Sequence, residues 1–398
     1  MPTTGSMRRR RDEGEQRASS IELFFDLVYV FAVTQLSHRL LRHLSAFGAL
    51  ETAVLLAMVW LVWVYTTWVT NYLDPSRLPV RLMLLAVMLG SLVMSAAIPE
   101  AFAGRGLWFG AGYAVLQIGR TVFGIVALRD DPLLATFQRV LVWCLVSGAL
   151  AAAGGLVHGD VRFGLWLAAV AVDLLGSSVG FRTPGLGRST TADWTIEGNH
   201  FADRCQAFIL IALGESIVTI GQTLSQSSHV SGDQVAAFAT AFLGVLALWW
   251  VYFDRSADDA ARLVAASDDP GRLGRSAYHA IHPLMVGGII VTAAADDLVV
   301  QHAGGATSLS VRWLVCGGTA LFLAGHAAFK AVIWRVVPWS RLLAIVALAV
   351  LGLASADLSS EVLGLLALAV VLALIVVDRV WLGSSTAAKS MASTGSEA

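Results

Sequence analysis

Apolar segments of about 20 residues, the length that spans the hydrocarbon core of a bilayer, recur along the whole chain. The connections between them are short and carry Pro, Gly and charge, as in "LDPSRLP" and "RTPGLGRST", which is typical of loops. The pattern predicts an all-α polytopic membrane protein with about 12 transmembrane helices, at 21–43, 49–71, 79–98, 107–128, 133–154, 161–180, 200–223, 232–253, 278–299, 312–334, 339–356 and 361–382.

Two short motifs indicate that the chain consists of two related halves. "WVYT" in the second predicted helix returns as "WVYF" in the eighth, 187 residues later, and the same separation relates Gln35 to Gln222. We therefore expect a parallel six-plus-six repeat, an arrangement common among transporters, whose sites lie between the halves. The predicted organisation is a basic tail, a first six-helix half, a linker, a second six-helix half and a disordered C-terminal tail, at 1–20, 21–183, 184–199, 200–383 and 384–398.

Composition and charge also indicate a protein whose surface is surrounded by lipid. The chain is 57% hydrophobic and 14% charged, with a mean hydropathy of +0.71, whereas soluble domains are about 25% charged. A net charge of −1 gives nucleic-acid binding no electrostatic support. The expected partners are the lipid bilayer and a small-molecule or ion substrate, and a homo-oligomer remains open.

The distribution of basic residues predicts the orientation of the helices. Most of the 27 Lys and Arg residues fall on the N-terminal side of the predicted bundle. The opposite side receives Arg39, Arg42, Arg105, Arg162 and Arg312. Because cytoplasmic loops carry the excess of Lys and Arg, this asymmetry predicts a multi-pass protein of the bacterial plasma membrane with both termini in the cytoplasm.

Ionisable side chains within the predicted helices are candidate functional groups, because charge is costly at membrane depth. Asp26 lies about one turn into the first helix, and Arg204 lies at the same level of the seventh helix if the halves are repeats. We predict an ion pair between them, joined by the neighbouring Glu22 and His200. Such a pair can belong to a functional site, or it can act only as a charge clasp that locks the two halves together.

Glu215 follows Gly214 near the middle of the seventh helix, with Arg120 and Asp173 at similar depth on other helices. It can pair with Arg120, or it can remain titratable, as proton-coupled carriers and membrane acid–base catalysts require. Glu215, Arg204 and Asp26 are therefore the candidate catalytic or coupling residues. The candidate substrate-binding residues are Arg120, Trp60, Trp63, His200, Gln222 and Asp173.

The two tryptophans and the histidine spacings require separate interpretation. Trp60 and Trp63 lie too deep to be interfacial anchors, so they line a cavity or pack between helices. Glu197 and His200 have the E-x-x-H spacing, but a di-iron bundle site needs a second copy and two further Glu residues. We therefore predict no metal site and no cofactor.

Four motifs together carry a family resemblance: "ELFFDLVYVFAVTQL", "WVYTTWVTNYLDP", "RLMLLAVMLGSLVMSAAIPEAF" and "HFADRCQAFILIALGESIVTIG". With these motifs the chain resembles the bacterial low temperature requirement protein A family over all 12 predicted helices. The resemblance implies a multispan inner-membrane protein and leaves its substrate open.

Three functional hypotheses follow. The first is a membrane protein that transports or binds a small molecule or ion at a polar cavity between the halves, with Glu215 as the binding or coupling carboxylate. The second, implied by relatives in hydrazine and azoxy biosynthesis, is a membrane enzyme that rearranges an O-aminoacyl hydroxylamine to an N–N-bonded product. There Glu215 would be the acid–base group, and Arg120 or Arg204 would orient the substrate. The third is a structural or cold-adaptation membrane protein, which needs no polar cavity.

Overall fold

The computed structural model describes residues 7–9, 18–190, 197–227, 230–254, 256–305 and 307–394, with side chains up to residue 380. Apart from two isolated β-bridges, these residues form helices and the segments that connect them. The first half contains α1 (Ser20–Arg42), α2 (Ala46–Tyr72), α3 (Leu78–Ala97), η1 (Ile98–Glu100), α4 (Gly106–Ala127), α5 (Leu134–Leu156) and α6 (Gly159–Ser178). The second half contains α7 (Gly198–Gln226), α8 (Gly232–Phe253), α9 (Ser256–Ala265), α10 (Pro270–Leu273), a π-helix (Gly274–Ile281), α11 (His282–Gln301), α12 (Leu309–Trp334), α13 (Trp339–Ala354) and α14 (Ser360–Thr394).

The helices confirm the predicted all-α, multispan fold. Within the described residues, 11 helical segments are long and apolar enough to cross a membrane. The remaining predicted span is α13, whose 16 residues make it a shorter apolar helix. Two features were not predicted: a short helix, α9, that continues beyond α8, and a π-helical turn that opens the α11 segment. The six-plus-six repeat and the orientation of the termini remain predictions.

Serine side chains define where several helices begin, because they accept hydrogen bonds from backbone N–H groups that have no partner within the helix. Ser19 and Glu22 form a capping box at the start of α1, and Ser231 forms one with Gln234 at the start of α8. Ser308 caps α12 in the same way, through the N–H of Val311. The capping box of Ser19 and Glu22 fixes where α1 begins, and with it the level of the polar residues that follow on this helix.

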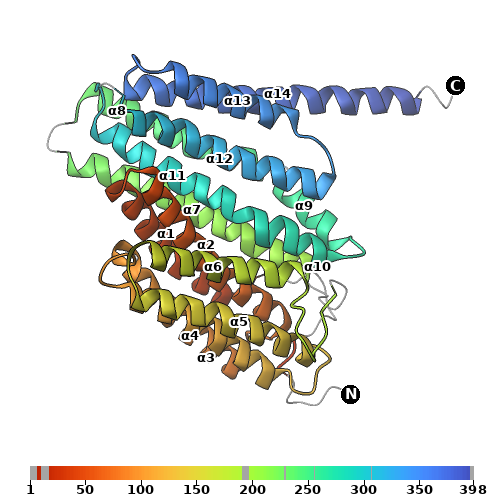
Figure 1. Ribbon diagram of the computed structural model, residues 1–398. Coiled ribbons are helices and arrows are strands. Elements are labelled where there is room, and N and C mark those ends of the chain that lie inside the picture. Colours follow the sequence, from red (N-terminus) through yellow and green to blue (C-terminus); the bar gives the residue numbers. More distant parts are fainter. Residues whose placement is uncertain are drawn as a thin grey trace.

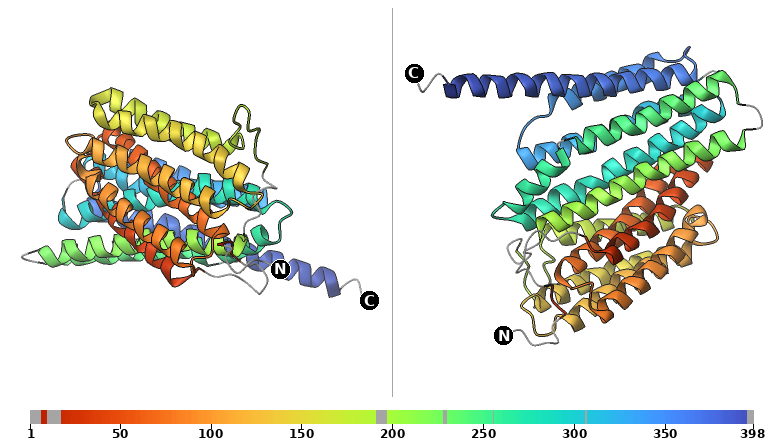
Figure 2. Two further views of the ribbon diagram at one scale, coloured as in Figure 1. Left: turned by 90° about the horizontal axis from the view of Figure 1, so that it is seen from below. Right: turned by 180° about the vertical axis from the view of Figure 1, so that it is seen from behind.

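The two halves lie side by side, with α1, α2, α7 and α11 in the middle of the bundle (Figure 1). Helices α3 to α6 form the outer part of the first half, and α8 and α12 to α14 form the outer part of the second (Figures 1 and 2). Both termini lie at the same end of the bundle, on the right of Figure 1. We call this the terminal end, and we call the contact of α1 and α2 with α7 and α11 the seam.

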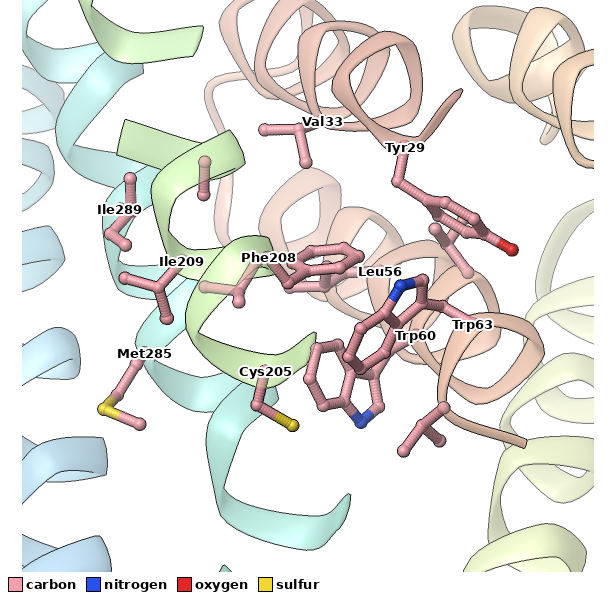
Figure 3. Packing of buried hydrophobic residues seen from close by; sticks show 14 of the residues in the cluster. Tyr29, Val33, Leu56, Trp60, Trp63, Cys205, Phe208, Ile209, Met285 and Ile289 are labelled. Atoms are coloured by element: carbon pink, nitrogen blue, oxygen red, sulfur yellow. The ribbon is translucent and has the colours of Figure 1, made fainter. Parts of the chain in front are cut away.

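The middle of the seam is filled by aromatic and aliphatic side chains (Figure 3). Phe208 of α7 lies between helices of the other half, with its ring centroid 4.7 Å from that of Trp63 and 5.2 Å from that of Trp60. Tyr29 of α1 completes the cluster, 5.9 Å from Phe208. These rings are almost completely buried, so apolar packing rather than a polar cavity occupies this part of the seam.

The outward-facing surface of the bundle is apolar. Many large hydrophobic side chains are exposed along outer helices, among them Leu82 and Leu89 of α3, Val115 of α4 and Leu343 of α13. Soluble monomers rarely expose continuous apolar surface on this scale. The exposed side chains are therefore suited to contact lipid, which agrees with the multispan fold.

Candidate functional site

The Asp26–Arg204 ion pair predicted from the sequence is present at the seam. Arg204 Nε donates to Asp26 Oδ2 at 2.7 Å, and Nη2 donates to Oδ1 at 2.6 Å. The indole Nε1 of Trp63 donates to the same Oδ1 at 2.6 Å. Asp26 is 1% exposed and Arg204 is completely buried. The guanidinium and carboxylate thus meet in the bidentate geometry that gives the strongest hydrogen-bonded ion pairs.

Glu22 and His200 extend this network towards the terminal end. Asn71 holds His200 in place: its Nδ2 lies 3.1 Å from His200 Nδ1, and its Oδ1 accepts from the backbone N–H of Glu197 at 2.9 Å. His200 Nε2 lies 2.9 Å from Glu22 Oε1 and also 2.9 Å from Arg9 Nη1, so one ring nitrogen faces both a carboxylate and a guanidinium. These contacts on both ring nitrogens fix the orientation of the imidazole.

We call Glu22, Asp26, Trp63, His200 and Arg204 the clasp. The clasp joins α1 and α2 of the first half to α7 of the second. Its two carboxylates are balanced by Arg204 and by Arg9, whose Nη1 lies 3.4 Å from Glu22 Oε1. A buried ion pair adds little net stability compared with apolar packing, but removal of one partner is costly. The clasp therefore links the two halves through charged groups that are costly to remove singly, whether it serves a functional site or only locks the halves together.

A second polar network lies within the first half and connects Arg120 to Asp173 through Gln117. Arg120 Nη2 donates to Gln117 Oε1 at 2.6 Å, and Gln117 Nε2 donates to Asp173 Oδ2 at 3.1 Å. Tyr113 donates a short hydrogen bond to the same carboxylate oxygen. Arg120 and Asp173 are both buried and do not touch each other. Gln117 thus acts as a polar bridge between a buried cation and a buried anion.

Glu215 belongs to neither network. Its side chain is 3% exposed, and its Oε1 accepts from Thr219 Oγ1 at 3.0 Å. The pairing with Arg120 that the sequence left open is not formed: within the described part of the chain, Glu215 takes part in no ion pair. A buried carboxylate without a cationic partner is a functional candidate on physical grounds.

A line of polar groups continues from Glu215 along α7 to the end opposite the termini. Thr223 Oγ1 lies 3.0 Å from the carbonyl oxygen of Thr219 and forms a short hydrogen bond with Asp297 of α11. Asp297 Oδ1 also accepts from Gln301 Nε2 at 2.8 Å. We call Glu215, Thr219, Thr223, Asp297 and Gln301 the polar ladder. It follows one face of α7, because its members on that helix are four residues apart.

The other candidate residues from the sequence occupy different environments. Trp60 is buried and its Nε1 donates to the carbonyl oxygen of His279 at 2.8 Å, so this side chain links α2 to the π-helix. Gln222 is exposed and lies apart from the clasp and from Asp173. The structure thus brings Asp26, Trp63, His200 and Arg204 together and leaves Glu215 in a separate site.

The sequence analysis missed three residues that complete these networks. Asn71 is a residue type that often caps helices and it lies at the end of its helix, yet its side chain reaches across the seam to Glu197 and His200. Gln117 lies one turn before Arg120, a spacing that predicts contact on one helix face. Thr223 continues the four-residue spacing of Glu215 and Thr219, which was the available signal for the polar ladder.

Comparison with known proteins identifies the family. A sequence model described as "Bacterial low temperature requirement A protein (LtrA)" matches residues 17–377. A Rhizobium meliloti protein described as uncharacterised is 36% identical over 340 residues, which cover 85% of this chain and 83% of that protein. No solved structure matches the chain. The chain therefore belongs to the bacterial low temperature requirement A family of multispan membrane proteins.

Proposed function

We propose that the protein is a carrier that moves a small molecule or ion across the bacterial plasma membrane, with Glu215 as its coupling carboxylate. The observation that carries this proposal is the polar ladder, which connects Glu215 to the end of the bundle opposite the termini. Glu215 lies 11 residues before the end of α7, or about 16 Å at 1.5 Å per residue. The proposal requires that a proton or small cation enters at that end and moves past Thr223 and Thr219, whose link runs through the backbone carbonyl oxygen of Thr219, to reach the carboxylate.

The clasp supplies the second element of a carrier, a closed gate at the terminal end. Its carboxylates, guanidinium and imidazole are engaged with one another and are inaccessible to solvent. With the terminal end in the cytoplasm, this conformation has its cytoplasmic side closed. Opening of that side requires the halves to separate at the seam, as in the rocking motions of other two-part transporters.

The arrangement of the arginines favours transport over the biosynthetic alternative. An enzyme that uses Glu215 as its acid–base group needs a cation close by to orient a substrate carboxylate. Arg204 is engaged by Asp26, and Arg120 is engaged by Gln117 and by the carbonyl oxygen of Val62 at 3.2 Å. Neither guanidinium is available beside Glu215 in this conformation. A purely structural role leaves the buried carboxylate of Glu215 without a reason.

Metabolite profiling of cells and medium tests the proposal. A knockout strain is compared with strains restored by wild type, by Glu215→Gln and by the control Glu100→Gln, which makes the same chemical change at an exposed residue. For a carrier, at least one compound is redistributed between cells and medium in the knockout and the Glu215→Gln strain, and wild type and Glu100→Gln restore its distribution.

Two outcomes contradict the proposal. If a precursor accumulates inside the cell and its product disappears from both cells and medium, the enzyme hypothesis replaces transport. If Glu215→Gln restores the wild-type distribution completely, the coupling role of Glu215 is wrong, and the clasp becomes the candidate site.

A further inference from the structure

A cavity of about 40 Å³ lies within the second half, between α8, α11, α12 and α14. Since one water needs about 10–15 Å³ of such a cavity, there is room for roughly three water-sized groups. The wall consists mostly of small and aliphatic side chains, together with four residues that carry side-chain oxygens: Thr240 of α8, Thr292 and Asp296 of α11, and Thr319 of α12. The cavity can therefore hold a small ion with one or two waters, but not a drug-sized organic molecule.

Asp296 brings a carboxylate without a partner into this wall. Its Oδ2 is buried and forms no hydrogen bond, and in the described part of the chain Asp296 takes part in no salt bridge. Asp297, the next residue of α11, differs because its Oδ1 accepts from Thr223 and from Gln301. An ionised Asp296 therefore lacks a counter-charge, and a protonated Oδ2 would lack an acceptor for its hydrogen. Neither form of this carboxyl group is satisfied by the protein alone.

Two threonine hydroxyls of the same wall are oxygen acceptors. Thr292 Oγ1 donates to the carbonyl oxygen of Gly288 at 2.9 Å. Thr319 Oγ1 donates to the carbonyl oxygen of Val315 at 3.1 Å. A hydroxyl has one hydrogen and two lone pairs, so both oxygens can still accept but have no hydrogen left to donate. Among the described residues that line the cavity there is no lysine, arginine or histidine, so the available groups favour a cation over an anion.

The charge around the cavity favours the same kind of ion. Asp296 lies five residues before the end of α11, or about 8 Å at 1.5 Å per residue, from the end opposite the termini. The acidic residues at this end of the second half include Asp233, Asp357 and Glu361. The described residues there contain one arginine, Arg312, which does not line the cavity and forms no salt bridge with Asp296. An excess of acidic groups raises the local concentration of cations.

We propose that this cavity binds a small monovalent cation, Na⁺, with the carboxylate of Asp296 as its charged ligand. The hydroxyl oxygens of Thr292 and Thr319 are the neutral ligands, and one or two waters complete the coordination within the remaining volume. Hard cations prefer oxygen ligands of this kind. One carboxylate balances a single positive charge, whereas a divalent ion would leave a costly net charge at membrane depth. The site is separate from Glu215 of α7, which does not line the cavity, so the inference does not require the carrier function.

Binding is measured on the purified full-length protein in nanodiscs by a scintillation proximity assay, with ²²Na⁺ as the probe. We expect saturable binding that unlabelled NaCl displaces and that choline chloride at the same ionic strength does not, because choline is too large for the cavity. Asp296→Asn should weaken binding about tenfold or more, since it removes the charged ligand and keeps its size. The matched control Asp357→Asn makes the same change at an exposed residue of the same end and should leave the affinity unchanged.

A second variant tests the neutral ligands and is used alone if Asp296→Asn does not fold. Thr319→Val keeps the shape of the side chain but removes its hydroxyl oxygen, and should weaken ²²Na⁺ binding about fivefold. The inference is overturned by the absence of saturable ²²Na⁺ binding, which is the result expected if Asp296 is simply protonated. It is also overturned by equal displacement with choline, by wild-type affinity in either cavity variant, or by an equal loss of affinity in Asp357→Asn.

Glu215→Gln separates this inference from the proposed function, since it should bind ²²Na⁺ like wild type. Intact ²²Na⁺ binding without any transport defect in Glu215→Gln contradicts the carrier alone. A Glu215-dependent redistribution of metabolites without ²²Na⁺ binding contradicts the cation site alone. Loss of ²²Na⁺ binding in Glu215→Gln, with wild-type affinity in Asp296→Asn, assigns the ion to Glu215 and overturns the inference.

Discussion

The clasp predicts a large energetic coupling between two residues that are far apart in the sequence. Arg204→Met leaves the buried carboxylate of Asp26 with only the indole of Trp63 as a hydrogen-bond donor. Asp26→Leu leaves the guanidinium of Arg204 with two long hydrogen bonds of 3.4 Å, to Glu22 and to the hydroxyl of Thr70. Removal of one partner of a buried ion pair lowers the free energy of unfolding by about 3–5 kcal/mol.

The double variant removes both charges at once and restores an apolar contact of similar volume. Buried ion pairs replaced in this way give proteins of equal or higher stability, so the double variant should lie within about 1–2 kcal/mol of wild type. The coupling free energy between the two substitutions is then at least about 3 kcal/mol. Equilibrium unfolding in mixed SDS micelles, followed by tryptophan fluorescence, measures the free energy of each variant.

A matched cycle at the surface controls for nonspecific effects of charge removal. Arg262 and Asp259 of α9 form an exposed pair, with side chains 72% and 47% accessible. Their coupling should be about 0–1 kcal/mol, because solvent screens exposed pairs. The clasp argument is refuted if losses in the Asp26 and Arg204 single variants simply add in the double variant, or if each single variant loses less than the surface control.

Three further variants test individual contacts. Trp63→Phe removes the indole donor to Asp26 and should lower the free energy of unfolding by about 1.5–3 kcal/mol in the same SDS assay; a wild-type value contradicts this. Gly288→Ala should lower the melting temperature, because its Cβ would lie 2.4 Å from the backbone of α12, whereas Gly317→Ala meets no atom within 4 Å and is the control; equal melting temperatures contradict the close packing. Arg335→Gly should raise the melting temperature, since Arg335 ends α12 with a left-handed φ of 55° that glycine adopts without strain; a fall contradicts it.

The depth of a residue in the membrane can be predicted from the sequence. A bilayer fixes the length of each apolar segment, and for this reason the predicted helix at 232–253 coincides with α8 (Gly232–Phe253). The Asp26–Arg204 pair was accessible to the same reasoning, since each residue lies six residues after the start of its helix (Ser20 for α1, Gly198 for α7), and the two helices begin at the same end. One-dimensional patterning is sufficient for such features.

The hydrophobic pattern does not predict which side chains of neighbouring helices contact each other. Glu215 and Arg120 have similar predicted depths in the membrane, yet Glu215 contacts Thr219 and Arg120 contacts Gln117. Equal depth therefore does not show which residues are in contact. Asn71 shows the same limit, because one amide can cap its own helix or bridge to a neighbour, and only packing decides between these roles. The π-helix could not be predicted either, because its sequence has the same hydrophobic pattern as the start of an ordinary α-helix.

The separation of the clasp residues along the chain has a consequence for biosynthesis. Asp26 and Arg204 are 178 residues apart, so at about 5–20 residues per second the guanidinium is synthesised roughly 10–40 s after the carboxylate. Trp63 follows Asp26 after only 37 residues and is the earlier donor. During this interval α1 carries a carboxylate whose buried counter-charge does not yet exist. We therefore expect α1 to reach its final position in the membrane only after α7 has been inserted.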